Sequence, residues 1–458
     1  MEQRGAWATN IGFILAAAGS AVGLGNIWKF PRLAFGNGGG AFIIIYLIIV
    51  FTLGVTVMLT EFVVGRNAQK NCVGAVRAID KRWSFIGGMG ILTGFIILSY
   101  YSHVGGWVLK YVVAYLTGGT SVYADPANFF LVDILGMGTS FPIQGALIYP
   151  FIFIGITAFV VIKGVAGGIE KLNKFMMPAL FVLLILLCIR GITIPDGAEG
   201  LKYLLYPDFS KVTGGTVLAA MGQAFFSLSL GMGVMATYGS YLSKQENLVK
   251  NTFLICSLDT LVALLAGFAM IPIAFAAGID IVNGGNAGFA FISLASAFQT
   301  MPFGTVFGAL FYILLLFAAL TSAISILEGT VAYVTEELKI GRTKAAIGLS
   351  AIMFSIGILY TLSQANMNLK GIWFDASGVT YPVLGDMMEF MTDKLLMPLG
   401  SLLFCILVGW VWGIDKASDE ASSQGKFSFK LKGAYMIMVK FIAPIAILLI
   451  MLSGFGII

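Results

Sequence analysis

Two glycine-rich segments offer backbone groups to a ligand within otherwise apolar sequence. The first covers residues 19–26, with the sequence GSAVGLGN, and the second covers residues 227–233, with the sequence SLSLGMG. Glycine weakens a helix by up to ~1 kcal/mol relative to alanine, so we expect each segment to interrupt the helix that contains it. An interrupted helix leaves carbonyl oxygens free to bind a cation, and its second half presents N–H groups to an anion.

Two acidic side chains lie in or beside strongly apolar stretches. Asp259 stands within the apolar residues 254–277, and Glu61 follows the apolar residues 41–59. An ionisable residue at membrane depth is a functional candidate by default. For Asp259 the competing interpretation is a protonated aspartate that caps a local bend. We expect Glu61 to accept hydrogen bonds from N–H groups that the second break frees, and the competing interpretation is an ion pair with Arg66.

The elements that carry these residues are suited to a lipid environment. Of the 458 residues, 59% are hydrophobic and 11% are charged, whereas a soluble globular protein is about a quarter charged. Repeated apolar stretches approach the ~20 residues that span hydrocarbon as a helix. They are continuous rather than alternating, so we predict an all-α membrane protein rather than a closed barrel. Examples are residues 41–59, 147–162, 261–277 and 441–451.

Composition argues against several other classes of protein. The four cysteines, at positions 72, 188, 256 and 405, are scattered without a CxxC pair, which supports neither a disulfide framework nor a zinc site. His103 is the single histidine, which argues against a histidine-ligated metalloenzyme, and we interpret it as a structural residue between helices. The basic residues are dispersed, with no run suited to nucleic acid.

We predict about eleven spans and a cytoplasmic N-terminus. The loops after the even-numbered spans are rich in lysine and arginine, whereas residues 117–144 and 278–302 contain neither. Positively charged loops remain in the cytoplasm, and an odd number of spans then places the C-terminus outside. We expect residues 278–302 to include a short helix that dips into an outer vestibule. The approximate span centres are residues 22, 51, 98, 154, 181, 228, 262, 318, 352, 400 and 445.

The two glycine-rich breaks fall at matching places in spans one and six. Interrupted hydrophobic segments at corresponding positions of two halves are typical of a binding site at the membrane midplane of a transporter. Close helix packing through Gly19 and Gly23 is the alternative. It accounts less well for Asn26 and for the hydroxyls of Ser227 and Ser229.

The motif around the first break closely resembles the first-helix signature of the neurotransmitter:sodium symporter family. Three further motifs, in spans two, six and eight, also fit that family. The resemblance therefore covers nearly the whole chain. The matching segments are Trp7, GSAVGLGNIWKFP at residues 19–31, NGGGAF at residues 37–42, EFVVGR at residues 61–66, QAFFSLS at residues 223–229 and LTS at residues 320–322.

This resemblance implies the LeuT fold, with a single transporter domain over residues 1–458. Five helices in residues 1–190 and five in residues 214–413 would form an inverted repeat, with helices one and six discontinuous. An additional helix would follow at residues 433–458, as in the bacterial branch of the family that lacks a twelfth helix. The segment Gly231-Met232-Gly233 is similar to that of bacterial carriers of hydrophobic and aromatic amino acids.

The resemblance also implies two sodium sites made of oxygen ligands, which suit a hard cation. For the hydroxyls of Thr321 and Ser322, bonding to carbonyls of their own helix is the competing interpretation. The expected ligands of the first sodium are the Ala21 carbonyl, Asn26, Ser227, Asp259 and the substrate carboxylate. Those of the second sodium are the carbonyls of Gly19, Val22 and Ala318 and the hydroxyls of Thr321 and Ser322.

A substrate with its own carboxylate is what the resemblance implies. Family members that carry amines have an aspartate where Gly23 stands in this chain. Met232 is unbranched and adaptable, so we expect a pocket that tolerates bulky apolar side chains. The substrate carboxylate would meet the N–H groups of Leu24 and Gly25 and the Tyr101 hydroxyl, and Ala21 and Ser227 are also expected at the substrate site. The substrate side chain would lie among Ile97, Tyr101, Phe226, Ser229, Met232, Ser322 and Ile326.

The resemblance gives Asp259 a more specific role. Many relatives have a neutral residue at this position and need chloride nearby to balance the charge of sodium. A fixed carboxylate would replace that anion. At an effective dielectric constant of ~20 and a separation of ~4 Å, its attraction to sodium is on the order of 4 kcal/mol before desolvation. We therefore predict transport without a chloride requirement.

Charged residues on either side of the first break are expected to form gates. Lys29 stands where the family usually has arginine, and we expect it to pair with Glu389 or, as an alternative, with Asp386. Lysine lacks the bidentate fork of arginine, so this outer gate would be looser. No role follows for Glu328. Gln223, Tyr101 and Phe226 would help to close the outer gate, and Arg4 with Glu336, Trp7, Ser240 and Tyr241 would form the inner gate.

These expectations describe a sodium-coupled symporter that carries hydrophobic or aromatic L-amino acids across the cell membrane by alternating access. Two alternatives stay open: a sodium- or proton-coupled carrier of another small zwitterion, and an amino acid sensor of the same fold that does not transport. A membrane enzyme is not expected, because the sequence has no cluster of catalytic groups at one depth. We expect two sodium ions, a small substrate and the bilayer as partners, and neither nucleic acid nor an obligate protein partner.

Overall fold

Long apolar runs fold into helices that are long enough to cross a membrane. The computed structural model describes residues 5–138, 141–279, 281, 285–365 and 384–458, and the regular elements in these ranges are helical. Exposed apolar side chains such as Ile48, Phe159 and Phe175 face outward, as the bilayer requires. Nine helices of the described part have the length and composition of a span: Gly40–Ala68, Lys81–Leu116, Ile143–Ile162, Val165–Thr193, Leu248–Ala276, Gly304–Glu337, Arg342–Gln364, Leu384–Ala421 and Lys432–Gly454.

Several spans change from α-helical to wider π-helical winding without a break, a feature that is frequent near functional sites. The elements within and between the long spans are α3 (Gly40–Ile49), η2 (Val50–Gly54), α4 (Val55–Ala68), α5 (Cys72–Ile79), η3 (Lys81–Trp83), α6 (Phe85–Leu116), α7 (Thr120–Ala124), α8 (Pro126–Asn128), η4 (Phe129–Ile134), η5 (Ile143–Ile148), α9 (Tyr149–Ile162), η6 (Val165–Glu170), α10 (Lys171–Thr193), α11 (Gly197–Leu205) and η7 (Phe209–Lys211). After the second break follow α14 (Leu248–Ala276), α15 (Gly285–Gly288), η8 (Phe289–Ser293), α16 (Leu294–Thr300), α17 (Gly304–Glu337), α18 (Arg342–Gln364), α19 (Leu384–Phe390), η9 (Met391–Leu396), α20 (Met397–Ile406), η10 (Leu407–Gly413), α21 (Ile414–Ala421), α22 (Lys432–Ile437), η11 (Met438–Ile442) and α23 (Ala443–Gly454).

The first span bends at its glycine-rich segment. α1 (Asn10–Ala21) begins at Thr9, whose hydroxyl accepts the Gly12 N–H, and it ends where Val22 adopts an extended backbone. The chain continues as η1 (Gly25–Lys29) and α2 (Phe30–Gly36). The two halves meet at an angle of 56°.

The second break separates α12 (Gly214–Ser227) from α13 (Val234–Ser240). In between, Gly231 and Gly233 have φ values of 82° and 68°, a region that glycine adopts without the penalty of a Cβ atom. Ser229 shares this left-handed conformation, with φ of 53°. Discontinuous helices one and six are thereby confirmed. The described residues contain nine helices with the length and composition of a span, or ten with the bent first helix, and the short helices α12 and α13 lie at the position of the expected sixth span.

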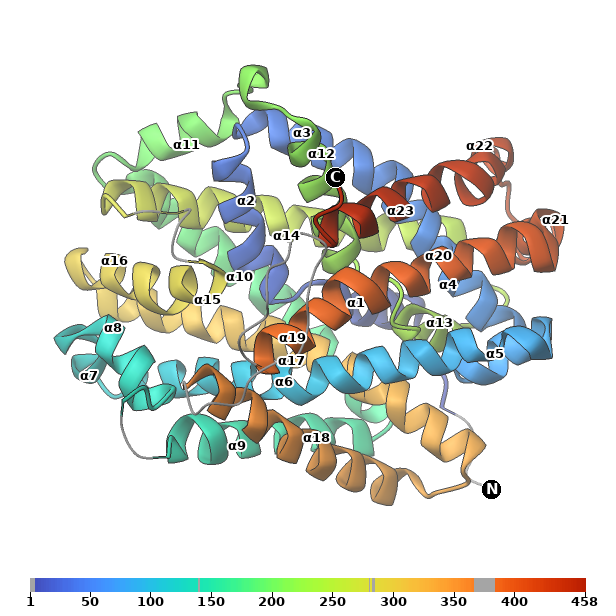
Figure 1. The fold of residues 1–458 in the computed structure, drawn as a ribbon, viewed down its shortest axis with the longest axis horizontal. Coiled ribbons are helices and arrows are strands. Elements are labelled where there is room, and N and C mark those ends of the chain that lie inside the picture. The colour runs from blue at the N-terminus through green and yellow to red at the C-terminus, as the bar shows by residue number, and fades with distance from the viewer. Residues whose placement is uncertain (1–4, 139–140, 280, 282–284, 366–383) are drawn as a thin grey trace.

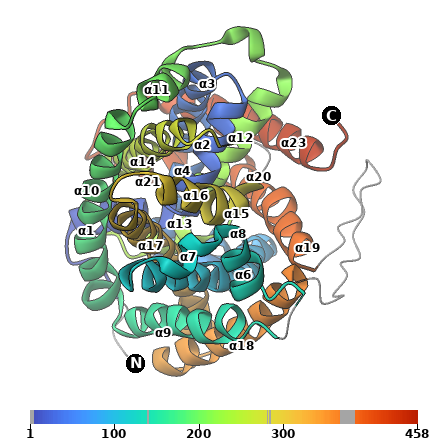
Figure 2. The same cartoon turned by 90° about the vertical axis from the view of Figure 1, so that its left-hand side faces the viewer.

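The interrupted helices lie inside the bundle. α1 packs against α10, α14 and α17, and α13 packs against α4. α17 also packs along α6, and α6 is covered by α9 and α18. Figures 1 and 2 show α9 and α18 at one side of the bundle and α3 and α11 at the opposite side, with α1 and α13 between them. Each break is therefore surrounded by continuous helices that can hold ligands against it.

A short apolar helix, Phe289–Thr300, lies in the segment where the sequence predicted one. Aromatic packing holds it, because the Phe291 ring contacts the rings of Trp28, Trp107 and Phe130. The Tyr111 hydroxyl also donates to the Phe291 carbonyl at 2.6 Å. This segment is consequently fixed over the first break rather than extended away from it.

Candidate functional site

A cavity of about 370 Å³ lies between the two interrupted helices, with further walls from α6 and α17. Its lining includes residues of both breaks and further side chains from α18, α19, η9 and α20, so local unwinding and the packing of several spans create it together. Every residue that the sequence placed around a substrate lines this cavity. These residues are Ala21, Leu24, Gly25, Ile97, Tyr101, Phe226, Ser227, Ser229, Met232, Ser322 and Ile326.

Glycine is needed in the first break for steric reasons. A Cβ atom on Gly25 would lie 2.6 Å from the Phe226 ring. On Gly23 it would lie 2.9 Å from the Ser322 hydroxyl and 3.5 Å from the Tyr101 hydroxyl. The space beside Gly23 is therefore part of the cavity. A side chain at this position would occupy volume that a ligand could otherwise fill.

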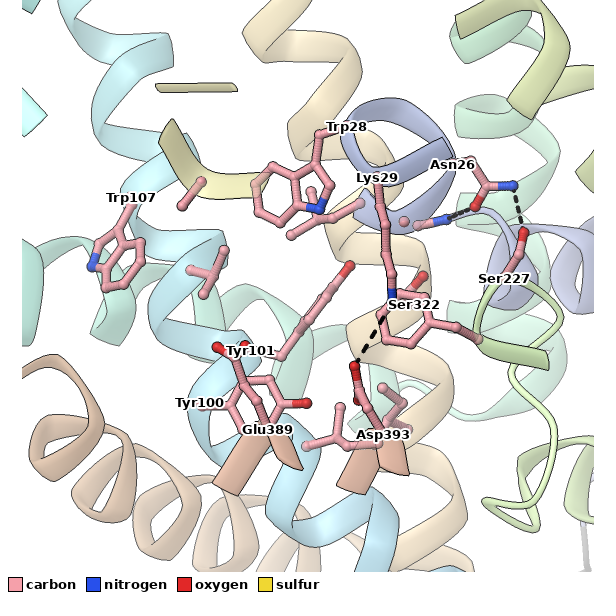
Figure 3. Close-up of a pocket in the computed structure, with 18 of the residues that line it drawn as sticks. Asn26, Trp28, Lys29, Tyr100, Tyr101, Trp107, Ser227, Ser322, Glu389 and Asp393 are labelled. Atoms are coloured by element: carbon pink, nitrogen blue, oxygen red, sulfur yellow. Dashed lines mark hydrogen bonds and ion pairs between the residues drawn. The ribbon is translucent and has the colours of Figure 1, made fainter. Parts of the chain in front are cut away.

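The side chains expected at the first sodium form one buried cluster. The Asn26 amide donates to the Ser227 hydroxyl at 2.8 Å and to an Asp259 carboxylate oxygen at 2.7 Å. Ser227 donates to the other Asp259 oxygen at 2.8 Å (Figure 3 shows the Asn26–Ser227 pair). All three are buried, and within the described ranges no lysine, arginine or histidine pairs with Asp259. The Ser227 and Asp259 oxygens fit an alkali cation, whereas Asn26 turns its amide nitrogen towards them and its Oδ1 accepts the Gly23 N–H at 3.1 Å.

The expected ligands of the second sodium lie where α17 meets the first break. The Ser322 hydroxyl reaches across to the carbonyls of Ser20 and Val22, at 3.2 and 3.1 Å. Thr321 instead donates to carbonyls of its own helix, including Ala318 at 3.1 Å, as in the competing interpretation. A hydroxyl that donates one hydrogen bond keeps lone pairs for a cation, so both oxygens can serve as ligands.

Glu61 contacts the second break. The Gly231 N–H donates to its carboxylate at 2.6 Å, the contact expected from the sequence. The competing ion pair between Glu61 and Arg66 is not formed. Arg66 is fully buried and donates to the Glu420 carboxylate at 2.7 Å. It also donates to the Glu246 carbonyl at 2.8 Å, so it joins α4 to α21 and to the α13–α14 loop.

The outer charged residues do not pair as the sequence suggested. The Lys29 ammonium lies 4.0 Å from the Asp393 carboxylate and 4.2 Å from the centre of the Phe226 ring, whereas the expected partner, Glu389, accepts the Tyr360 hydroxyl at 2.8 Å. Figure 3 shows Lys29 extending from the first break towards Asp393. Asp393 lies one turn beyond Glu389, and this spacing was the signal that could have identified it. The Gln223 amide donates to the Gly25 carbonyl at 3.0 Å, beneath this pair.

The opposite side of the cavity is closed by aromatic and charged groups. The Trp7 indole donates to the Tyr238 carbonyl at 3.0 Å, and its ring packs on Tyr238 and Tyr241. Ser240 donates to the Thr237 carbonyl at 2.6 Å. Glu336 accepts from the Asn71 backbone at 2.7 Å. Arg4, its expected partner, lies outside the described residues.

Glu328 gains a structural context that the sequence did not reveal. It is fully buried on α17, it accepts the Tyr241 hydroxyl at 2.8 Å, and it forms an ion pair with Arg342. Arg342 also donates to the Val161 carbonyl at 2.8 Å. This network joins α9, α13, α17 and the start of α18. Its members are far apart in sequence, so no local pattern could have connected them.

A largely apolar cavity between two interrupted membrane-spanning helices, with backbone and hydroxyl groups of both breaks in its wall, is typical of an ion-coupled transporter. Residues 4–122 and 117–457 match the model of the Sodium:neurotransmitter symporter family. The chain belongs to this family, and it is a multi-pass membrane protein.

Its relatives extend over the full length of the chain. An uncharacterized sodium-dependent transporter of Bacillus subtilis, YhdH, is 36% identical over 98% of both chains. The sodium- and chloride-dependent taurine transporter of Homo sapiens is 26% identical over 91% of this chain and 73% of that protein. Among solved structures, MhsT in complex with L-phenylalanine has a TM-score of 0.86 and 38% identity, and the match covers 99% of this chain and 100% of MhsT.

Proposed function

We propose that this protein is a sodium-coupled symporter of hydrophobic or aromatic L-amino acids and that it works without chloride. The observation that carries the proposal is the cavity between the two breaks, with Asn26 and Ser227 in its wall and the Asp259 carboxylate buried behind them, in contact with both. This arrangement sets a negative charge and unwound backbone beside one apolar chamber. A zwitterion and a cation can therefore bind there together.

The lining supports an amino acid as substrate. The N–H groups of Leu24 and Gly25 in the unwound first helix suit a carboxylate, and the Tyr101 hydroxyl, which also lines the cavity, suits it as well. Ile97, Met232 and Ile326 make the rest of the chamber apolar. The structural relative MhsT was solved with L-phenylalanine, which is consistent with a bulky apolar substrate.

Two sodium ions would bind next to this substrate. The first would use Ala21, Asn26, Ser227, Asp259 and the substrate carboxylate, and the second would use Gly19, Val22, Ala318, Thr321 and Ser322. Two ions that enter down a tenfold gradient yield ~1.4 kcal/mol each, and ~100 mV adds ~2.3 kcal/mol per charge. The total of ~7 kcal/mol is enough to concentrate a zwitterion about 10⁵-fold.

Transport would proceed by alternating access, with the N-terminus in the cytoplasm. The repeats at residues 1–190 and 214–413 supply the two discontinuous helices, and the gates close in turn on either side of the chamber. A ligand moves such an equilibrium only through its different affinity for the two states. Sodium would therefore favour the form open to the outside, and the substrate would complete the first sodium site before the outer gate closes.

Uptake by the purified protein in proteoliposomes tests this function. We expect labelled L-phenylalanine to accumulate in a sodium gradient, at the same rate in chloride and in gluconate, with competition from apolar and aromatic L-amino acids. Binding without uptake would instead indicate a sensor, and uptake driven by a pH gradient without sodium would indicate proton coupling. Asp259→Asn should abolish uptake in gluconate, because the first sodium site then lacks its fixed negative charge.

A further inference from the structure

An asparagine on α10, beside the expected second sodium site, has an oxygen that no hydrogen-bond donor of the described residues reaches. Asn173 is fully buried, and its amide nitrogen donates to the Ile169 carbonyl at 2.9 Å. That bond fixes the orientation of the carboxamide, because only its nitrogen can donate. The Asn173 Oδ1 atom therefore faces away from Ile169, and it has no hydrogen-bond donor among the described residues.

The position of this oxygen follows from its distance to Gly19. A Cβ atom built on Gly19 would lie 2.3 Å from Asn173 Oδ1, 3.2 Å from the Thr321 Cβ and 3.2 Å from the Met177 sulfur. Gly19 and Thr321 are two of the expected ligands of the second sodium. Asn173 Oδ1 thus lies at the junction of α1, α10 and α17, where those ligands gather.

Hydrogen bonds fix the start of α10 against the start of α1, and they thereby also fix the position of Asn173 relative to α1. Glu170 accepts the Ala8 N–H and the Thr9 hydroxyl, both at 2.7 Å. Asn173 lies three residues further on, on the same face of the helix. Glu170 meets α1 near its start, and Asn173 meets it near the break, at Gly19.

We propose that Asn173 supplies an oxygen to the second sodium, so that α10 completes a site otherwise made by α1 and α17. This inference rests on the proposed sodium coupling. An amide carbonyl oxygen is a hard ligand of the kind that alkali and alkaline-earth cations prefer. A bound cation also satisfies a buried acceptor that no donor reaches. Gly19 then has a second function, because any larger residue would displace the Asn173 oxygen.

Sodium binding to the purified protein tests the inference without relying on uptake. ²²Na⁺ binding and the sodium-dependent rise in unfolding temperature are measured in detergent, without substrate, for the wild type, Asn173→Leu and Asn173→Asp. We expect Asn173→Leu to raise the half-saturating sodium concentration about tenfold, which corresponds to ~1.4 kcal/mol. Asn173→Asp retains an oxygen and should bind sodium at least as well as the wild type.

Met177→Leu is the matched control, because Met177 faces the same point near Gly19 but offers no hard oxygen. It should leave the half-saturating sodium concentration within about twofold, or ~0.4 kcal/mol, of the wild-type value. Equal sodium affinity in Asn173→Leu and the wild type would overturn the inference. If Asn173→Leu does not fold, Asn173→Ala replaces it, with the same expected loss of affinity. A wild type that shows no sodium dependence would instead refute the proposed function itself.

Discussion

The two sides of the cavity are closed by different kinds of contact. On the Trp7 side, the fully buried Glu328 accepts the Tyr241 hydroxyl and pairs with Arg342, whose side chain is 20% exposed, and the Trp7 ring packs on Tyr241. On the Lys29 side, the ammonium of Lys29 and the carboxylate of Asp393 are 4.0 Å apart, with about a quarter of each side chain exposed. The contacts on the Trp7 side are short and include a fully buried carboxylate. Among the described residues, the ion pair found on the Lys29 side is long and partly exposed.

This difference indicates which contacts determine the equilibrium between the forms that are open on the Trp7 side and on the Lys29 side. Removing one partner of a buried ion pair leaves an uncompensated charge and costs about 3–5 kcal/mol. A partly exposed pair contributes about 0–1 kcal/mol. The Trp7 side should therefore carry most of the free energy that holds this conformation, and the Lys29 side should open readily.

Glu328→Gln should have the largest effect on this comparison. Arg342, with a fifth of its side chain exposed, would lose its carboxylate partner, and the closed form of the Trp7 side would lose about 3 kcal/mol, the lower end of the range for a buried pair. We expect faster maleimide labelling of a cysteine introduced as Ser240→Cys, measured in sodium-containing buffer. Unchanged labelling would show that the network does not hold this side closed.

Trp7→Ala should act in the same direction with a smaller effect. The substitution removes the hydrogen bond to the Tyr238 carbonyl and the ring contacts with Phe13, Tyr238 and Tyr241. Trp7 is only half-buried, so we expect a loss of about 2 kcal/mol, below the usual range for a core tryptophan. The same Ser240→Cys labelling assay measures it, and Trp7→Phe, which retains a ring, is the control.

Asp393→Asn and Glu389→Gln separate the two candidate partners of Lys29. Only the first removes the charge nearest to Lys29, and it should change the apparent substrate affinity about threefold, or ~0.7 kcal/mol. Glu389→Gln should change it by less, because Glu389 is held by the Tyr360 hydroxyl. Equilibrium binding of labelled substrate measures both variants. A larger effect of Glu389→Gln would restore the pair expected from the sequence.

Lys29→Arg should have the smallest effect and would make the two sides more alike. A guanidinium can form a bidentate contact with Asp393 that an ammonium cannot, which is worth up to about 1 kcal/mol at a partly exposed site. We expect slower substrate dissociation. The rate is measured by adding excess unlabelled substrate and following the loss of bound labelled substrate. Faster dissociation would mean that the larger side chain disrupts the cation–π contact with Phe226.

The spans and breaks that form the chamber could be predicted, because each depends on residues close together in the sequence. The apolar runs specify spans wherever the solvent is lipid, and the glycines of residues 19–26 and 227–233 weaken the helix in place. The family resemblance then assigned the residues around these breaks to a substrate pocket, and they line one cavity. Arg66, in contrast, seemed a candidate partner for Glu61 on the same helix but pairs with Glu420.

The sequence by itself determined the membrane class and the position of both breaks, because helix winding and bilayer partition depend on residues close together in the chain. The residues around the chamber followed from the family resemblance. Only the tertiary structure decided which charges meet. Lys29 meets Asp393, Glu328 meets Tyr241, and Asn173 lies beside Gly19, each on a helix far away in sequence, and one helical turn separates Asp393 from Glu389. Such choices depend on the rotation and register of packed helices, which the composition of a single segment does not encode.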